Sequence, residues 1–314
     1  MMAELPGEMG LRITVLGRGA WGSTLARLWQ DDGHAVRSWS RRDGGDAVVL
    51  LSDCDLVVSA VSMAAVAGLA RSLAPHWPAP LPLRSCSKGL DLDGLCSASQ
   101  LWGQQLAGAP LAVLSGPNLA DELDRGLPAC SVVSSSDAAL ALRLQLALRV
   151  PHLRLYTNAD PIGTEAAGAL KNVMAVAAGI SDGLGLGDNA KASLLTRGLA
   201  EIGAVLAALG GQTSTLYGLA GLGDLLATAN SPLSRNYRFG QALAAGLSES
   251  QALAAIGATV EGQRTARAAM RLAARQGWRL PICEQVVCLL DGAIDAPQAV
   301  QSLMQRDLRA EVEP

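Results

Sequence analysis

One stretch decides the fold of the first part of the chain: LRITVL (11–16) followed by GRGAWG (17–22). The β-branched run predicts a strand, and residues 20–31 predict a helix. Between them, Gly17 permits a tight turn, Gly19 lets the backbone approach a pyrophosphate, and Gly22 allows the helix to pack on the strand. The free N–H groups of the helix N-terminus suit the same anion. The stretch predicts a dinucleotide site, with a ligand-free glycine turn as the alternative.

Outward from this stretch, short strands alternate with helical segments up to residue 156. We predict strands at 11–16, 35–40, 56–61, 83–87, 111–115, 129–134 and 153–156. Strands that alternate with helices predict crossover connections and a parallel sheet. Residues 1–156 are therefore expected to form a doubly wound, Rossmann-like α/β domain that binds NAD(P).

After Asp160-Pro161, periodic segments rich in Ala, Leu and Gly continue to the end of the chain. We predict that residues 157–314 form an all-α substrate and catalytic domain. Helix breaks are expected at 183–187, 210–211, 218–223, 231–232 and 277–281, where helix-stopping residues gather.

Composition limits the possible partners. The 314 residues are 50% hydrophobic and only 3% aromatic, with a net charge of −3 and scattered Lys and Arg. This argues against nucleic acid. Met1 to Gly10 contain no secretory signal pattern, and no apolar run is long enough for a membrane span, so we expect a cytoplasmic protein. The six cysteines lack metal-binding spacing, so we expect reduced core thiols and no metal.

Arg41 and Arg42 follow the second predicted strand, where an NAD-selective site usually has an acidic residue for the ribose 2′-hydroxyl. Two guanidinium groups there favour a cofactor with a 2′-phosphate. The alternative is a pair of solvated loop charges.

Lys171 stands in IGTEAAGALKNVMAV (162–176), which is apolar or small on nearly every side and predicts a buried helix. A buried lysine is rare without a partner or a task, and desolvation lowers its pKa toward that of a working base. Hydride removal from a secondary alcohol needs a group that takes the hydroxyl proton. Lys171 is our candidate, and an ion pair with Glu165 or another acid is the alternative.

Three further features are candidates for the same site. Lys88 ends a predicted strand at the edge where doubly wound folds bind ligands, or is a surface lysine in a turn. Asp224 precedes an apolar helical run, and a helix cap is its alternative role. The tripeptide Ser234-Arg235-Asn236 offers donors for a phosphate ester, or forms a capping loop.

Together these residues resemble the bacterial NAD(P)-dependent glycerol-3-phosphate dehydrogenase family from about residue 11 to about residue 307. The resemblance lies in ordered blocks: SGPNLA (115–120), GALKN (168–172), ISDGLGLGDNAK (180–191), TRGLAE (196–201), AGLGDL (220–225), SRN (234–236), RFG (238–240) and VEG (260–262).

The resemblance implies an enzyme that interconverts glycerol 3-phosphate and dihydroxyacetone phosphate with NAD(H) or NADP(H), supplies phospholipid synthesis and forms a homodimer. It implies that Lys171 is the proton acceptor. The residues it places around the substrate are Lys88, Gly116, Asn118, Lys171, Asp224, Ser234, Arg235 and Asn236. Those it places near the cofactor are Trp21, Arg41, Lys88, Ala120, Arg235, Thr259 and Glu261.

The chain departs from the family pattern at three places. Only twelve residues separate Arg42 from Asp55, where the family usually has another helix and strand, so we expect a sheet that lacks an edge strand. Ser62 replaces a frequent proline, and Glu165 stands at a usually glutamine-like position.

Two other functions are weighed against this one. A related 6-phosphogluconate or β-hydroxyacid dehydrogenase would keep the glycine loop and a helical lysine, but should lack the 221–224 and 234–236 blocks. The shortened segment after Arg42 suggests instead a non-catalytic nucleotide-binding sensor derived from the enzyme.

Overall fold

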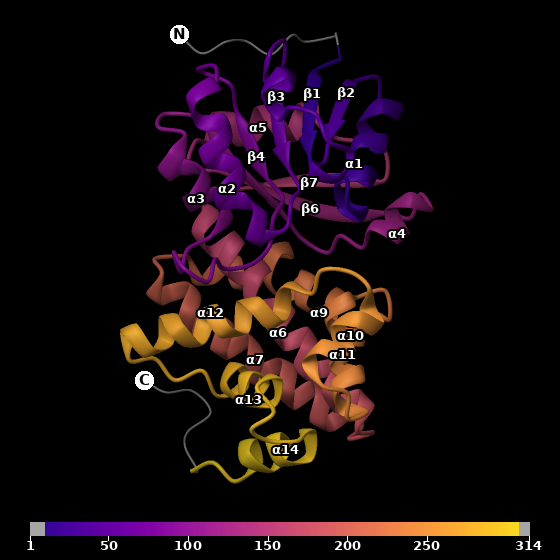
Figure 1. Cartoon of the computed structure of the whole chain (residues 1–314), viewed down its shortest axis with the longest axis vertical. Coiled ribbons are helices and arrows are strands. Elements are labelled where there is room, and N and C mark those ends of the chain that lie inside the picture. Colours follow the sequence, from indigo (N-terminus) through magenta and orange to yellow (C-terminus); the bar gives the residue numbers. More distant parts are fainter. Residues whose placement is uncertain (1–9, 308–314) are drawn as a thin grey trace.

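The computed structural model describes residues 10–307 as two parts, a sheet covered by helices and a bundle of helices (Figure 1). The sheet part comes first in the chain, and the last strand ends at Asn158 before a helix that begins at Pro161. The prediction about a targeting signal in Met1 to Gly10 concerns residues that, apart from Gly10, lie outside the described range.

The sheet has seven strands in the order β2-β1-β3-β4-β5-β6-β7. All seven predicted strands are present, with small differences at their ends, which confirms the Rossmann-like fold. Their bounds are β1 (Arg12–Leu16), β2 (Ala35–Trp39), β3 (Leu56–Ser59), β4 (Leu83–Ser85), β5 (Leu111–Ser115), β6 (Ala129–Ser134) and β7 (Leu153–Asn158).

The sheet is parallel as predicted except at one pair of strands. β5 and β6 run antiparallel, with Leu114 opposite Val133. Helix α4 (Ala120–Asp124) lies between them and has five residues. A helix of that length spans only about 7 Å, so it cannot return the chain to the far end of the sheet, as a parallel connection requires.

Within residues 10–307 the sheet ends at β2, so it lacks the further edge strand that is usual in the family, as expected. Two short 3-10 turns replace the usual helix and strand, η1 (Arg41–Asp43) and η2 (Ala47–Leu51). Arg37 of β2 fixes this segment, because its guanidinium donates to the carbonyls of Leu50 and Ser52 at 3.2 and 2.7 Å. The shortened segment is thus folded against the sheet part.

Helices cover both faces of the sheet, as in a doubly wound fold. Side chains of α1 (Ala20–Asp31), α4 and α5 (Ala138–Ala147) form one apolar layer. Those of α2 (Met63–Leu73), α3 (Ala98–Gln105) and η2 form the other. The loops that follow β3, β4 and β5 contact the helical part, where Met63 donates to Glu261, Lys88 donates to Asp224, and Pro117 lies beside Gly223.

One strand brings a charge into this core. Arg84 of β4 is 0% exposed, and its guanidinium carbon lies 4.6 Å from the centre of the Trp29 ring. Within residues 10–307 no oxygen accepts a hydrogen bond from its three side-chain nitrogens, and the Cys86 thiol is the polar group beside them. Burial lowers the pKa of Arg84, and Cys86, two residues along the strand, acts in the opposite direction.

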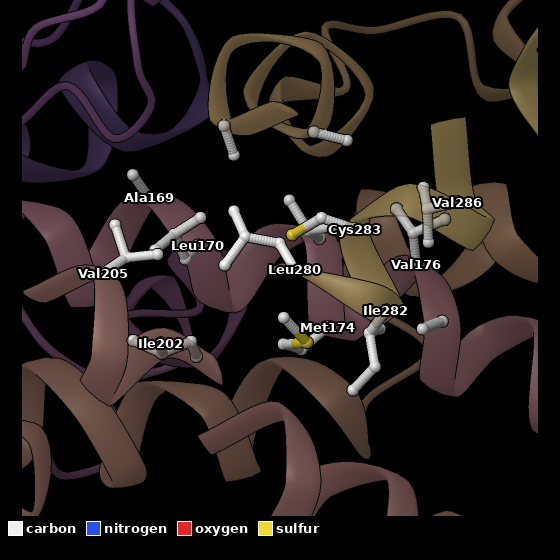
Figure 2. Close-up of a cluster of buried hydrophobic side chains, with 14 of the residues drawn as sticks. Ala169, Leu170, Met174, Val176, Ile202, Val205, Leu280, Ile282, Cys283 and Val286 are labelled. Carbon is white, nitrogen blue, oxygen red and sulfur yellow. The ribbon is translucent and has the colours of Figure 1, made fainter. Parts of the chain in front are cut away.

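The helical part is built around α6, which is buried almost continuously from Gly163 to Ser181, as its apolar sequence predicts. Figure 2 shows the apolar cluster that α6 shares with α7 and with the segment from Leu280 to Val286. The helices are α6 (Pro161–Gly183), α7 (Asp188–Ala208), α8 (Thr213–Leu216), η4 (Leu219–Gly223), α9 (Asp224–Ala229), α10 (Arg235–Ala244), α11 (Glu249–Ile256), α12 (Glu261–Gln276), α13 (Pro281–Leu290) and α14 (Ala296–Met304).

Four of the five predicted helix breaks are present, and the fifth, at 218–223, is confirmed only at Gly218. There the chain forms η4, a π-helical turn from Leu219 to Gly223 that leads directly into α9. Gly221 permits this turn, because a Cβ at that position would lie 2.0 Å from the carbonyl oxygen of Leu216. The glycines that predicted a break instead allow the backbone of η4 to pack closely against the carbonyl of Leu216.

All six cysteines are free; Cys86 and Cys283 are fully buried, and Cys54 and Cys96 are half-buried against one core cluster. Cys130 and Cys288 are half-buried and belong to none of the core clusters, so the prediction of core thiols is wrong for these two. Within residues 10–307, no three or more His, Cys, Asp and Glu side chains form a group that could hold a metal ion. No helix in the same range has the length and apolar character to cross a membrane.

Candidate active site

The glycine loop has the geometry of an anion site. Gly17 has φ +110°, and a Cβ there would lie 2.6 Å from the carbonyl oxygen of Ala60. A Cβ on Gly22 would lie 2.0 Å from the carbonyl oxygen of Gly17, so this position requires glycine for packing. A Cβ on Gly19 would meet nothing within 4 Å, and no side chain caps α1. The helix N-terminus is open to a phosphate group.

At the interface of the two parts, two lysines share one carboxylate. Lys88, from the loop after β4, donates to Oδ2 of Asp224 at 2.6 Å. Lys171 of α6 lies 3.0 Å from Oδ1 of the same carboxylate. Lys171 and Asp224 are 6% and 2% exposed, so the cluster is withdrawn from water. Neither Lys171 nor Asp224 is therefore a solvated charge. The N-cap of α9 is Gly223, so Asp224 does not have the capping role that was its alternative.

The charges in this cluster shift two pKa values. The pKa of Lys171 is lowered to about 8, mainly by burial; Asp224 opposes this shift, and the nearby charges of Lys88 and Arg235 contribute to it. Burial raises the pKa of Asp224, but the two lysines outweigh it, so the net shift is downward. A buried amine that titrates near neutral pH can both donate and accept a proton. The ion pair that was the alternative for Lys171 is present, with Asp224 rather than Glu165 as the acid.

Sequence reasoning missed Thr228, a residue of α9 that contacts the same amine. Lys171 donates to Oγ1 of Thr228 at 2.6 Å, and Thr228 donates to Asp224 at 3.2 Å. Thr228 is four residues after Asp224, the spacing that places side chains on one helix face. This spacing is visible in the sequence. It identifies Thr228 as a contact of Lys171 only once Asp224 is known to lie on a helix that faces Lys171.

The loop after β5 completes one wall of the cluster. The carbonyl of Gly116 accepts from Lys88 at 3.0 Å. Gly116 has φ +137°, and its missing Cβ would lie 3.0 Å from the Cα of Ser131. Asn118 accepts from Ser131 at 2.5 Å, while its buried Nδ2 has no partner. That amide leaves a donor for a bound molecule.

The N-terminus of α10 brings the predicted tripeptide to the same region, with three separate roles. Ser234 is the helix cap, since its Oγ accepts from the backbone of Tyr237. Arg235 is exposed and close enough to act on the pKa of Lys171. Asn236 instead joins helices, donating to Asn172 and accepting from the backbone of Gly262, both at 2.9 Å.

Glu261, at the start of α12, reaches across to the sheet part. Its Oε1 accepts from the backbone of Met63 at 3.1 Å, at the first residue of α2. Its Oε2 is buried without a partner, and burial raises its pKa. An acceptor in that position fits a cofactor hydroxyl or amide.

The remaining predicted cofactor residues lie around these groups without a contact that defines their role. Trp21 and Ala120 are half-buried near the N-termini of α1 and α4. Thr259 is exposed. Arg41 and Arg42 are exposed on η1, beyond the carboxyl end of β2.

The fold and the site define a class of protein. A glycine loop fitted to a dinucleotide faces a helical bundle that supplies a desolvated amine and several donors for an anion. This is the arrangement of a nicotinamide-dependent dehydrogenase whose second half is all-helical.

Comparison with known proteins gives the family. The models for the N-terminus and C-terminus of NAD-dependent glycerol-3-phosphate dehydrogenase match residues 12–50, 44–141 and 160–301. The glycerol-3-phosphate dehydrogenase [NAD(P)+] of Synechococcus sp. (strain RCC307) is 55% identical, covering 96% of this chain and 100% of that protein. The protein of the same name from Trichormus variabilis is 47% identical over 95% of this chain and 98% of its own length.

A solved structure agrees. The crystal structure of glycerol-3-phosphate dehydrogenase from Coxiella burnetii is 34% identical, has a TM-score of 0.91, and covers 95% of this chain and 99% of that one. This chain belongs to the NAD(P)-dependent glycerol-3-phosphate dehydrogenase family. Its cofactor is therefore NAD(P)(H), and the related 6-phosphogluconate or β-hydroxyacid dehydrogenase is set aside.

Proposed function

We propose that Lys171 exchanges the proton of the carbinol oxygen as this chain interconverts glycerol 3-phosphate and dihydroxyacetone phosphate. The environment of the Lys171 amine is the observation that supports this role. The amine is buried, its pKa is lowered to about 8, and its position is held by Asp224 and Thr228 at the interface of the two parts.

The hydrogen bonds of Lys171 leave one position for the substrate. A charged amine has three donors, and Asp224 and Thr228 take two of them. During reduction, the third N–H polarises the ketone and passes its proton to the oxygen that becomes the hydroxyl. During oxidation, the lone pair of the neutral amine takes that proton. The bound nicotinamide supplies or accepts the hydride.

The phosphate ester binds, in this proposal, beside the N-terminus of α10. Lys88 and Lys171 together exceed the single charge of Asp224, so the cluster has net positive charge for an anionic substrate. Arg235 adds a third cation, and the free N–H groups of α10 favour a phosphate. Gly116, Asn118 and Ser234 would line the space around the triose.

For the cofactor, we propose that Gly17, Gly19 and Gly22 hold the pyrophosphate and that Arg41 contacts a 2′-phosphate. The exposure of Arg41 and Arg42 beyond β2 supports a preference for NADPH, with a solvated pair as the alternative. Substitution Arg41→Ala is expected to weaken NADPH binding by about tenfold and NADH binding much less. Equal losses for both cofactors, measured by titration, would refute the preference.

One assay tests the activity. Purified protein is mixed with dihydroxyacetone phosphate and either NADPH or NADH, and the absorbance of the reduced cofactor is followed. Consumption of the cofactor only when the triose phosphate is present is the expected result. Tight cofactor binding without turnover would instead favour the sensor function.

The remaining expectations are part of the proposal. A division into residues 1–156 and 157–314, a homodimer, a cytoplasmic location and a role in phospholipid synthesis follow from the sequence and the family. Light scattering coupled to gel filtration measures the oligomeric state, and a monomer at working concentration would contradict the dimer.

A further inference from the structure

An ion pair joins the glycine loop to the shortened segment after β2. Arg18, the second residue of the loop, donates through Nη1 to Oδ2 of Asp43 at 2.8 Å. Asp43 is the last residue of η1, which also contains Arg41 and Arg42. The side chains of Arg18 and Asp43 are 54% and 51% exposed, and an ion pair of that exposure contributes little to folding. Stability alone therefore gives no reason for an arginine at this position.

The backbone brings Arg18 to the end of β2. In the sheet, Leu16 lies opposite Trp39, and the N–H of Gly17 donates to the carbonyl of Trp39 at 2.8 Å. Arg18 follows Gly17 directly, and Arg41 follows Trp39 by two residues. In a doubly wound fold, the adenosine ribose binds at the end of this second strand, with its 2′-hydroxyl or 2′-phosphate. Arg18 and Arg41 thus stand on two segments that meet where that group binds.

The turn after β2 is folded back on the strand that it follows. Ser40 Oγ accepts from the backbone N–H of Arg42 at 3.2 Å, and Trp39 Nε1 donates to the carbonyl of Gly45 at 3.1 Å. The contact of Asp43 with the glycine loop adds a third connection. The segment that lacks the usual helix and strand therefore has a defined shape beside the loop.

The cations in this region outnumber their partners. Asp43 accepts from one nitrogen of Arg18, so the other donors of that guanidinium have no acceptor among residues 10–307. Arg41 and Arg42 are exposed and form no ion pair within the same range. The next acid along the chain, Asp46, is the N-cap of η2. Like charges repel, so guanidinium groups gathered in this way favour a bound anion.

From this geometry we propose that Arg18 is a specificity-determining residue, which binds the 2′-phosphate of NADPH together with Arg41. That phosphate carries about two negative charges and three free oxygens, more than one arginine satisfies. Asp43 keeps the guanidinium beside η1 and leaves its remaining N–H groups to the phosphate. NADH has a hydroxyl at this position and gains little from the charge. The inference deepens the proposed preference for NADPH and rests on it.

The decisive experiment compares two exposed arginines that each pair with an aspartate of another segment. Arg27 of α1 pairs with Asp124 of α4 and lies nine residues after Arg18. Arg18→Ala and Arg27→Ala lose the same charge and a similar ion pair. Calorimetric titration without substrate measures the binding of NADPH and NADH. It also measures two fragments that differ at the same position, adenosine 2′,5′-bisphosphate and adenosine 5′-monophosphate.

We expect Arg18→Ala to weaken the binding of NADPH and of the bisphosphate by about fivefold or more, because charge-assisted hydrogen bonds to the phosphate are lost. The binding of NADH and of the monophosphate should change by less than about twofold. Arg27→Ala should bind all four as the unmodified protein does. Equal losses for NADPH and NADH would place Arg18 on the shared pyrophosphate. That result, or no loss for either, would overturn the role of Arg18 even if Arg41→Ala is selective for NADPH.

A second variant tests the charge of the ion pair while keeping its shape. Asparagine in Asp43→Asn can still accept from Arg18, but it no longer opposes a bound phosphate. The Kd for NADPH should fall by about twofold or more, and the Kd for NADH should stay the same. The gain should shrink at high salt, where exposed charges are screened. An unchanged Kd for NADPH, or a weaker binding of NADH, would show that Asp43 serves the ribose hydroxyls instead and would contradict the proposal.

Discussion

Lys171 and Arg84 are both buried cations, one in each part of the molecule, and within residues 10–307 only Lys171 is paired with a carboxylate. Lys171 contacts Asp224 and Thr228 and lies where the two parts meet. Arg84 lies inside the sheet core against the Trp29 ring and the Cys86 thiol, with no carboxylate among the groups that shift its pKa, so its charge is unpaired. Burial lowers the pKa of both residues. Burial alone therefore does not mark a functional cation.

The difference lies in what surrounds each charge. Lys171 has a carboxylate that keeps it partly charged, two neighbouring cations that oppose that charge, and a free hydrogen-bonding position. An arginine stays charged at every ordinary pH, so Arg84 offers no proton to a reaction. An unpaired buried charge is a cost to folding. The comparison predicts that loss of the Lys171 amine lowers activity, and that loss of the Arg84 charge raises the free energy of unfolding.

The largest effect is expected for Lys171→Ala. Loss of the amine should lower kcat by about 10²–10⁴-fold, because proton transfer to the carbinol oxygen then lacks its donor. Cofactor affinity, measured by titration, should stay the same. Lys191→Ala is the matched control, since Lys191 also pairs with an aspartate, Asp182, at 2.6 Å. Near-normal turnover in Lys171→Ala would contradict a catalytic role for Lys171 and leave it no more functional than Arg84.

Substitution Asp224→Asn tests whether pairing is what makes a buried lysine tolerable. Loss of the shared carboxylate should lower the free energy of unfolding by about 3 kcal/mol, because two lysines are left without a counter-charge. Asp224 raises the pKa of Lys171, so that pKa should also move below 8. Urea unfolding and the pH dependence of kcat/KM measure the two effects. Unchanged stability would mean that the cluster is solvated.

The pH profiles of the two directions should separate the roles of the amine. Ketone reduction needs the charged form, so its kcat/KM should be level at low pH and fall tenfold per unit as the pH rises through about 8. Alcohol oxidation needs the neutral form, so its kcat/KM should fall as the pH drops through the same value. Profiles of the same shape in both directions would contradict this assignment.

The smallest effect, and one of opposite sign, is expected for Arg84→Met. The change replaces an unpaired charge by an apolar side chain of similar length and should raise the free energy of unfolding by about 1–3 kcal/mol. Activity should stay the same, because Arg84 lies in the core between the sheet and α1. A destabilised variant would show that the Trp29 ring and the Cys86 thiol stabilise the guanidinium by more than its burial costs.

Much of the fold could be predicted from the sequence because local patterns determined it. Short β-branched runs bounded by turn residues predicted all seven strands, and the continuous apolar character of 162–176 predicted that α6 is buried. The antiparallel β6 could not be predicted, because its direction depends on the length of α4 rather than on its own residues. The η4 turn was missed because glycines also permit close helical packing.

The site was predictable only in part. The resemblance pointed to Lys88, Lys171 and Asp224, and the structure brings these three together. The contacts of Thr228 and of Arg18 depend on how separate segments pack, which no local pattern records. The block 180–191 is as conspicuous in the sequence as the lysine block, yet its Asp182 and Lys191 pair with each other and Asp182 accepts from Tyr237.

The short turn after β2 offers a position for engineering. Gly44 and Gly45 lie in it at positive φ, and a Cβ on either would meet nothing within 4 Å. Because loop closure costs grow slowly with length, extra residues there should be tolerated by the folded chain. A grafted helix and strand could extend the sheet beyond β2 and show directly how much a longer wall adds to selection between the two nicotinamide cofactors.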